Sequence, residues 1–218
     1  MVKKTLVRES LLVILLAATF LYGCKKDSSI EVSGVITDPN QTIPVENARV
    51  ELWTQQIDSG IFSANYVLQG TATTGPDGLF HFIIDKKNYT GIRLIFSKDK
   101  YYGWQAELNV NSENNYHAEY QLLPQAQLQI RVKNNEPFNT ADYFEFRILN
   151  GYTGCEECCH GEKYQFTGME VDQTINCRTA GHQDILIQWS SRKSGEQVYK
   201  TETYFIMEFE TTVIEFLY

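Results

Sequence analysis

The sequence predicts an all-β protein, with two consecutive β-sandwich domains behind an N-terminal signal peptide. From Ile30 onward, segments of roughly four to eight residues alternate apolar and polar side chains, a period typical of half-buried strands. Turn residues separate these segments, and no window after Cys24 keeps a helical period. The 13 Tyr and 12 Phe residues favour strands as well. Many short strands joined by tight turns favour sandwiches over a parallel α/β sheet.

The N-terminal segment has the layout of an export signal. An apolar run from Leu11 to Tyr22 follows a basic start that contains Lys3, Lys4 and Arg8. A helix that crosses the hydrocarbon of a bilayer needs about 20 apolar residues. This run has 12 residues, so it predicts a cleaved signal peptide rather than a retained transmembrane helix.

A cysteine motif ends this apolar run. It reads Leu21-Tyr22-Gly23-Cys24, and the polar stretch Lys25-Lys26-Asp27 follows. The motif resembles the lipobox of bacterial lipoproteins, in which the cysteine is acylated and becomes the mature N-terminus, although Tyr22 is bulkier than usual. An ordinary cleaved signal peptide is the alternative, and it needs no cysteine at the cleavage point.

The lipobox resemblance implies a layout and a location. Residues 1–23 form the lipoprotein signal peptide, and residues 24–29 form a lipidated tether that carries a palmitate-type anchor on Cys24. Lys25 in place of Asp implies the outer membrane, by resemblance to lipoprotein sorting rules, and leaves open whether the protein faces the periplasm or the outside. We expect no other cofactor.

Net charge limits the partners. The chain holds 19 Lys and Arg and 27 Asp and Glu residues, of which three basic and one acidic residue lie in 1–23. Residues 24–218 therefore carry 16 basic and 26 acidic residues, a net charge of −10. This balance, spread without a basic block, argues against nucleic acid and against anionic lipid as binding surfaces.

The first half of the chain contains an ordered set of strand and turn segments. They are Gly34-Val35-Ile36-Thr37-Asp38, Ile43-Pro44-Val45, Ala48-Arg49-Val50-Glu51-Leu52, Thr71-Ala72-Thr73-Thr74, Gly75-Pro76-Asp77-Gly78 and Leu79-Phe80-His81-Phe82. Their order resembles the carboxypeptidase regulatory-like family, also described as transthyretin-like or prealbumin-like, whose members are small seven-stranded β-sandwiches. The resemblance covers about residues 30–110 and implies a domain at 30–123.

The residue types in these segments suit the positions that we expect for them in a β-sandwich. Pro44 cannot donate to a β-ladder and belongs at an edge or in a loop. Pro76-Asp77-Gly78 predicts a tight turn. The expected core consists of Val50, Leu52, Phe80, Phe82, Leu94 and Phe96.

The second half, 124–218, resembles no family that we recognise, and no sequence repeat links it to the first. Leu123-Pro124 is the expected joint, and the length of about 95 residues suits a second sandwich. The expected strands are Gln127 to Lys133, Tyr143 to Leu149, Gln173 to Arg178, Ile185 to Ser190, Gln197 to Phe205 and Thr212 to Leu217.

The densest group of chemically active side chains is a cysteine-rich loop. Cys155, Cys158, Cys159 and His160 lie within it, and Cys177 and His182 follow further along the chain. Export to an oxidising compartment favours two disulfides among the four cysteines. Adjacent Cys158 and Cys159 are poorly placed to bond to each other, so one is expected to pair with Cys155 and the other with Cys177. The alternatives are a zinc site formed by Cys155, Cys158, Cys177 and His182, or free, redox-active thiols.

No catalytic motif stands out. Ser59, Ser63 and Ser97 lack a nucleophile-elbow context, Glu113, Glu156 and Glu157 are expected to be solvated, and His81 and His117 lack metalloprotease spacing. Hydroxyisourate hydrolases share the sandwich but end in Tyr-Arg-Gly-Ser, whereas this chain ends Glu215-Phe216-Leu217-Tyr218. The two-Tyr, two-His iron set of intradiol dioxygenases has no match here, and there is no room for a carboxypeptidase catalytic domain.

The expected function is therefore a non-catalytic, lipid-anchored envelope module that resembles Bacteroidota-type lipoproteins and binds an unidentified protein or glycan. The alternatives are a carbohydrate-binding accessory of a glycan-uptake system and a zinc-binding envelope protein. Trp53, Tyr101, Tyr102 and Trp104 could form a sugar-stacking platform, but filling of the core or of a domain junction is the commoner role of such residues.

Overall fold

A computed structural model describes residues 29–58, 61–62, 65–110, 115–159 and 161–218. Its described residues form strands and turns without a helix, which confirms the all-β prediction. Within these ranges no helix is long and apolar enough to cross a membrane. The expected signal peptide, Cys24 and its tether up to Ser28 lie outside the described residues, as do Ser59, Ser63, Glu113 and His160.

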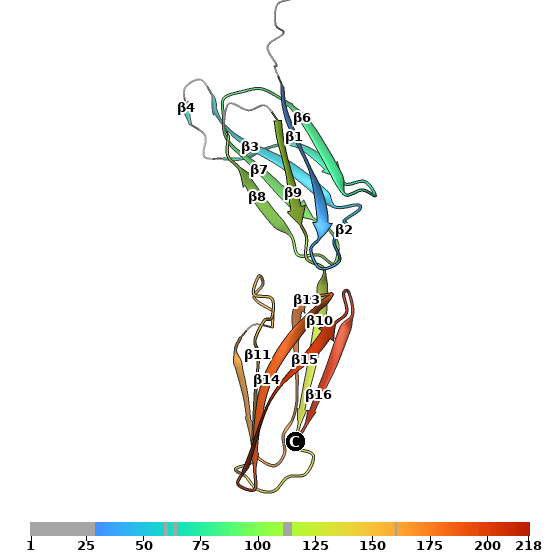
Figure 1. Ribbon diagram of the computed structural model, residues 1–218. Helices are drawn as coiled ribbons and strands as arrows, with labels where there is room; N and C mark the ends of the chain where they lie inside the picture. Colours follow the sequence, from blue (N-terminus) through green and yellow to red (C-terminus); the bar gives the residue numbers. More distant parts are fainter. Residues whose placement is uncertain (1–28, 59–60, 63–64, 111–114, 160) are drawn as a thin grey trace, which may run out of the picture.

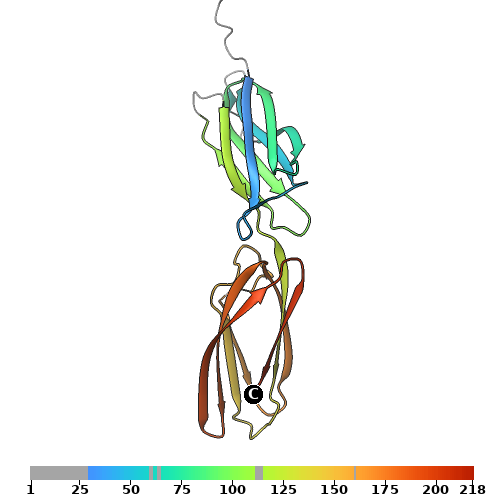
Figure 2. The ribbon, with the colours of Figure 1, turned by 45° about the vertical axis from the view of Figure 1, so that its right-hand side comes forward.

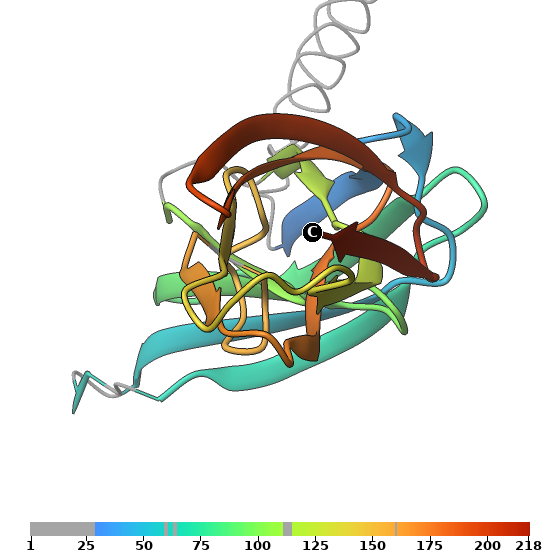
Figure 3. The same ribbon diagram turned by 90° about the horizontal axis from the view of Figure 1, so that it is seen from below.

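The strands form two sandwiches arranged end to end (Figures 1 and 2). Viewed along the long axis, the second sandwich lies over the first (Figure 3). The strands of the first are β1 (Ser29–Asp38), β2 (Ile43–Pro44), β3 (Arg49–Asp58), β4 (Ile61–Phe62), β5 (Val67–Thr73), β6 (Leu79–Asp85), β7 (Tyr89–Ser97), β8 (Trp104–Leu108) and β9 (Asn115–Gln121). Those of the second are β10 (Gln125–Lys133), β11 (Tyr143–Ile148), β12 (Lys163–Thr167), β13 (Asp172–Ala180), β14 (Gln183–Lys193), β15 (Glu196–Ile206) and β16 (Thr211–Leu217).

The first sandwich packs two sheets against one another. One sheet has β1 at its centre, with β6 antiparallel on one side and β9 parallel on the other. The other has the order β5-β3-β7-β8. The expected core residues between the sheets are all buried, namely Val50, Leu52, Phe80, Phe82, Leu94 and Phe96. Alternation therefore placed the core correctly, because every second side chain of a strand points to the same face.

Two glycines explain local features of the first sandwich. A Cβ at Gly34 would lie 2.4 Å from the carbonyl oxygen of Ala118, so glycine permits the close approach of β1 and β9. Gly78 has a φ of +72° and ends the predicted turn before β6, where its N–H donates to the carbonyl of Gly75. Pro44 lies in the two-residue edge strand β2, as its missing N–H requires.

The second sandwich also has two sheets, β13-β10-β16 and β12-β11-β14-β15. All six expected strands are present, with ends that differ by a few residues. Strand β12 was not anticipated, because Lys163–Thr167 follows the cysteine-rich loop and contains only two large apolar side chains, Tyr164 and Phe166. These two rings pack against the core, where each stacks on Phe146.

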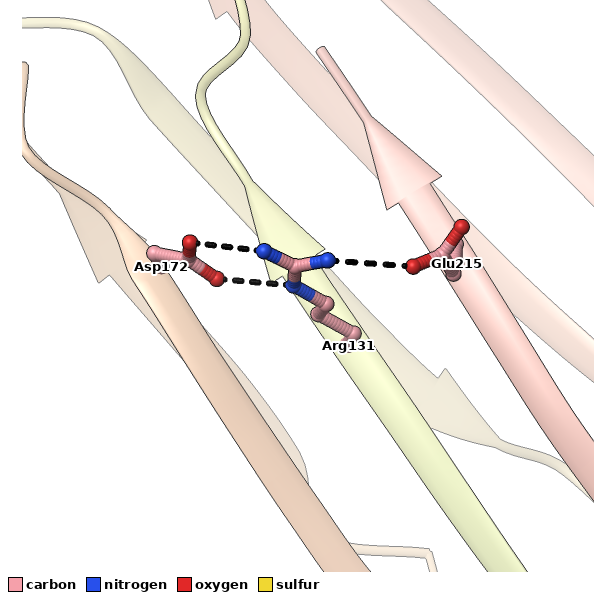
Figure 4. A network of polar contacts seen from close by, with 3 residues as sticks. All are labelled: Arg131, Asp172 and Glu215. Atoms are coloured by element: carbon pink, nitrogen blue, oxygen red, sulfur yellow. Dashed lines mark hydrogen bonds and ion pairs between the residues drawn. The ribbon is translucent and has the colours of Figure 1, made fainter.

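Charged side chains link the three strands of one sheet on its exposed face (Figure 4). Arg131 of β10 pairs with Asp172 of β13 at 2.9 Å and with Glu215 of β16 at 3.3 Å. The carboxylates raise the pKa of Arg131, and the guanidinium lowers the pKa of Asp172. The triad favours this strand order, but its exposure to solvent keeps its contribution small.

Both sandwiches have the same strand connectivity, although no sequence repeat links them. In the first sandwich β1 pairs antiparallel with β6 and parallel with β9, and β3 lies between β5 and β7. In the second, β10 pairs antiparallel with β13 and parallel with β16, and β11 lies between β12 and β14. Glu31 pairs with Asn115 and Gln127 pairs with Thr211, so both parallel pairs are 84 residues apart in the chain. Glu31 and Gln127 are themselves 96 residues apart. The protein is therefore a tandem structural repeat with a period of 96 residues along these strands.

The two hydrophobic cores are separate. Leu122 is the last residue of the first core along the chain, and Ala126 is the first of the second. Pro124, in the expected joint, forms an isolated bridge with Tyr101. The chain thus passes from one sandwich to the other over a few residues, so the connection between the two domains is short.

Candidate functional site

The cysteine-rich loop is closed by two disulfides. Cys155 bonds to Cys158 and Cys159 bonds to Cys177, with Cα–Cα distances of 5.2 Å in both pairs. The two adjacent cysteines thus have different partners, as the geometric argument required. Cys159 and Cys177 belong to the second core, so this disulfide joins the loop directly to β13.

This loop also contacts the first sandwich through Tyr102. The Tyr102 ring packs 4.2 Å from the ring of Tyr152, and its hydroxyl donates to the Thr179 carbonyl at 3.1 Å. The same hydroxyl lies 3.7 Å from Sγ of Cys158. Burial raises the pKa of Tyr102 to about 12, so it stays neutral and hydrogen-bonded at physiological pH. The disulfides therefore hold a loop that forms part of the junction.

Other contacts support the same junction. The Asn40 side chain donates to the Gly181 carbonyl at 2.8 Å, and the Gly181 N–H donates to the Pro124 carbonyl at 2.9 Å. The ring of Tyr101 packs against Phe209 at 5.3 Å. Contacts from several loops on both sides restrict bending between the sandwiches.

The zinc alternative does not fit this arrangement. A cysteine in a disulfide has no thiolate to offer, and Cys155, Cys158 and Cys177 are all so bonded. His182 instead packs edge-on against Phe205. Within the described ranges, no group of three or more His, Cys, Asp or Glu side chains could hold a metal ion.

The four aromatic residues considered as a sugar platform do not form one. Tyr101 and Tyr102 lie in the junction, and Trp104 stacks on Phe96 at 5.8 Å while remaining half exposed. The Trp53 indole donates to Glu51 at 3.0 Å. Core and junction packing therefore accounts for most of this group.

A histidine–serine contact on the first sandwich was not anticipated. Ser33 Oγ and His117 Nδ1 lie 3.0 Å apart on the outer face of β1 and β9, and His81 contacts Glu31 at 2.7 Å beside them. A serine nucleophile needs a base that is itself oriented in a protected site. These side chains lie in solvent on a sheet surface, so we read them as polar surface pairs.

A polar hollow on the second sandwich is a candidate binding site. It has a volume of about 130 Å³ and lies on the outer face of β11, β14 and β15. Its lining residues are Glu145, Phe146, Arg147, Lys163, Gln188, Trp189, Ser190 and Tyr199. Strand register explains the hollow, because Glu145 pairs with Ser190 and Ser190 pairs with Tyr199. The small serine thus forms a low point between two longer side chains.

The hollow contains a carboxylate that stays ionised. Glu145 forms an ion pair with Lys163 and accepts hydrogen bonds from Tyr143 and Gln165. Burial opposes ionisation, but these donors, with a weaker contact from Ser190, lower the pKa of Glu145 to about 2. Burial, and then the hydrogen bond to the charged Glu145, raise the pKa of Tyr143 to about 12.

Ser190 is the unusual member of this group. The residue is 3% exposed, and its hydroxyl interacts with Glu145 only weakly, without a partner at full hydrogen-bonding geometry among the described residues. A buried hydroxyl without a partner costs free energy, so such groups in native sites call for an explanation. Sequence reasoning missed the hollow because its residues are scattered from 145 to 199 and no local motif connects them.

Comparisons with known proteins add a fold likeness and no identity. No protein-family model and no curated protein sequence matches the chain. The solved structures that resemble it include the Bacillus anthracis TIE protein, with a TM-score of 0.36, 10% identity and coverage of 87% of this chain and 33% of that one. They also include the minor pilin GBS52 of Streptococcus agalactiae, with a TM-score of 0.33, 11% identity and coverage of 86% and 94%. The major pilin SpaD of Corynebacterium diphtheriae has a TM-score of 0.34, 8% identity and coverage of 83% and 66%. The chain thus spans about a third of the TIE protein, and the assignment of two β-sandwiches rests on its own strands.

Proposed function

We propose that this protein is a non-catalytic, lipid-anchored binding module of the bacterial cell envelope. In this proposal residues 1–23 are removed, Cys24 carries the lipid, and the outer membrane holds the mature chain. The lipobox-like sequence supports the anchor, and the segment order of residues 30–110 supports a carboxypeptidase regulatory-like first domain. We expect a protein or glycan partner, no nucleic acid, and no cofactor besides the lipid.

The junction is the observation that carries this proposal. Ser29, the first described residue, begins β1 at the end of the first sandwich that lies away from the second (Figure 1). Asp38, at the other end of β1, precedes Asn40 and its bond to Gly181 of the second sandwich. A lipid five residues before Ser29 would therefore place the first sandwich next to the membrane and the second sandwich away from it. The contacts of Tyr102 at the junction keep the second sandwich at that distance from the membrane.

The location of the hollow agrees with this arrangement. Tyr199 and Ser190 lie on the hairpin of β14 and β15, whose turn is at the end of the second sandwich remote from the junction (Figure 1). A ligand there would bind the part of the protein farthest from the anchor. We propose the first sandwich as a spacer and the second as the binding domain.

Membrane fractionation tests the anchor. Wild-type protein expressed in a host with lipoprotein processing should partition into the outer membrane and into detergent, with a lipid-modified N-terminal peptide at Cys24 by mass spectrometry. The Cys24→Ser variant should lose the lipid and the processing that depends on it. Lys26→Ser, two residues away, is the matched control and should behave as wild type. Detection of an unmodified Cys24, or unchanged processing of Cys24→Ser, would contradict the proposal.

Small-angle scattering tests the spacer. The wild-type body should give a distance distribution of two domains at a fixed separation. Tyr102→Ala should broaden that distribution, because it removes the ring contact with Tyr152 and the hydrogen bond to Thr179. A wild-type profile as broad as that of the variant would contradict a rigid spacer.

A further inference from the structure

We propose that the hollow on the outer face of β11, β14 and β15 binds a saccharide, with one sugar ring seated between Glu145 and Tyr199 above Ser190. The inference rests on the proposed function as a binding module, because it assigns a ligand class to the domain held away from the membrane. It places sugar binding at a site other than the four aromatic residues first considered.

Cross-strand rows give the hollow its shape. One row runs Gln165, Glu145, Ser190, Tyr199, and the next runs Lys163, Arg147, Gln188, Thr201. Opposed side chains on neighbouring strands lie about 5 Å apart, so four strands give a row long enough for one ring and its substituents. At about 130 Å³, the hollow has room for one sugar ring.

Hydrogen-bond donors and hydrogen-bond acceptors both line the hollow. Glu145 is an ionised acceptor, Arg147 and Lys163 are donors, and Gln188 offers both an amide donor and a carbonyl acceptor. A sugar hydroxyl donates and accepts at once, and it therefore suits a site in which donors alternate with acceptors. A simple cation suits the site less well, since Lys163 already neutralises Glu145. A simple anion would have to sit beside that carboxylate.

Tyr199 supplies the apolar surface that a sugar also needs. The residue is 67% exposed, although it lies on a regular strand of the second sandwich. Exposed aromatic rings present a flat face with little conformational entropy to lose on binding. The carbon-bound hydrogens of a pyranose can pack on that face while its hydroxyls point to the row below.

The buried hydroxyl of Ser190 is a further feature of the hollow. It lines the hollow, is 3% exposed, and beyond its weak contact with Glu145 has no partner at hydrogen-bonding geometry in the described part of the chain. Because the hydroxyl has almost no exposed surface, a ligand reaches it only when the surrounding side chains move. A ligand hydroxyl can then use the hydrogen-bonding capacity that the weak contact with Glu145 leaves open.

The arrangement binds without cleaving. Glycoside hydrolysis generally requires two carboxyl groups that flank the bond. The lining of the hollow contributes one carboxylate, Glu145, which is held ionised by Lys163 and so cannot act as an acid near neutral pH.

A saccharide panel tests the site on the full mature chain. The probes are soluble oligosaccharides of glucose, mannose, galactose, xylose and N-acetylglucosamine, each titrated to about 10 mM and followed by NMR chemical shifts and calorimetry. At least one should bind, with shifts centred on residues 188–199. Tyr199→Ala and Gln188→Ala should each weaken that sugar about tenfold or more while leaving the melting temperature unchanged, since both side chains are exposed. Phe138→Ala removes an exposed aromatic side chain outside the lining of the hollow and is the matched control.

The outcomes separate this inference from the proposed function. Binding that Tyr199→Ala and Gln188→Ala abolish, and that Phe138→Ala preserves, supports the saccharide site. No binding by any probe, or binding that both hollow variants leave within twofold of wild type, overturns it. In that case a lipidated Cys24 and a rigid junction would still support the envelope module, with a protein as its partner.

Discussion

Removal of the two disulfides one at a time should destabilise the second sandwich to different extents. Cys159 and Cys177 are 18 residues apart in the chain, whereas Cys155 and Cys158 are 3 apart. In the chain-entropy model, loops of these sizes correspond to about 3 kcal/mol and about 1.6 kcal/mol of stability, respectively. The Cys159→Ala/Cys177→Ala variant should also lose packing, because both side chains lie in the second core. We therefore expect it to be the more damaging pair by about 1.5 kcal/mol or more.

Hydrogen exchange and urea unfolding measure this difference. The Cys159→Ala/Cys177→Ala variant should lower the urea midpoint of the second sandwich by about 1 M or more, and amides of residues 150–180 should lose protection. The first sandwich contains no cysteine among its described residues, so residues 30–110 should keep their protection. Cys155→Ala/Cys158→Ala serves as the matched control, and full reduction should resemble the sum of both. Equal loss in both sandwiches, or equal effects of the two variants, would refute the reasoning.

Three further perturbations follow from single contacts. Gly34→Ala should lower the melting temperature of the first sandwich by overpacking worth about 1–3 kcal/mol, since its Cβ would meet Ala118 O at 2.4 Å; an unchanged calorimetric transition would contradict this. Tyr102→Phe should cost about 1 kcal/mol and speed exchange around residues 178–181, because it removes only the hydroxyl that donates to Thr179; unchanged exchange there would contradict it. The pKa of Glu145 is about 2 in the fold against an ordinary 4.5, so its contribution to stability is present above pH 4.5 and lost as the pH falls toward 2. Glu145→Gln should flatten the stability curve across that window in acid titrations followed by circular dichroism, and an unchanged slope would contradict this origin.

Strand positions and the core of the first sandwich were predictable because alternation is a local signal. Val50 and Leu52 are two residues apart, and both are fully buried as their spacing requires. The same signal located the six expected strands of the second sandwich. It failed for β12, since two large apolar side chains in five residues do not establish a period.

The tandem repeat was harder to recognise in the sequence, because equivalent core positions are apolar in both sandwiches but hold different residue types. Residues 96 positions apart occupy matching buried sites: Val32 and Leu128, Val50 and Phe146, Leu52 and Ile148, and Tyr120 and Phe216. Each pair is apolar, yet in each the residue type changes. Cores tolerate such exchanges when volume and pattern are kept. The spacing also varies among strands: Leu94 and Phe96 of β7 are equivalent to Ile187 and Trp189 of β14, 93 positions away, which weakens any single repeat period in the sequence.

Comparison of the repeats shows how the second sandwich forms the hollow. Glu145 and Ser190 are equivalent to the pair Arg49 and Ser97 of the first sandwich. Phe96 pairs with Trp104, so the next position in that register, equivalent to Tyr199, is Gly103. Strand β7 ends at Ser97, whereas β14 continues three residues past Ser190, to Lys193. The longer hairpin of β14 and β15 therefore places a tyrosine where the first sandwich has a glycine, and it adds the missing wall of the hollow. The elongated hairpin is a local addition to the repeated framework, and under the proposed function it is the feature that would make the second sandwich the binding domain.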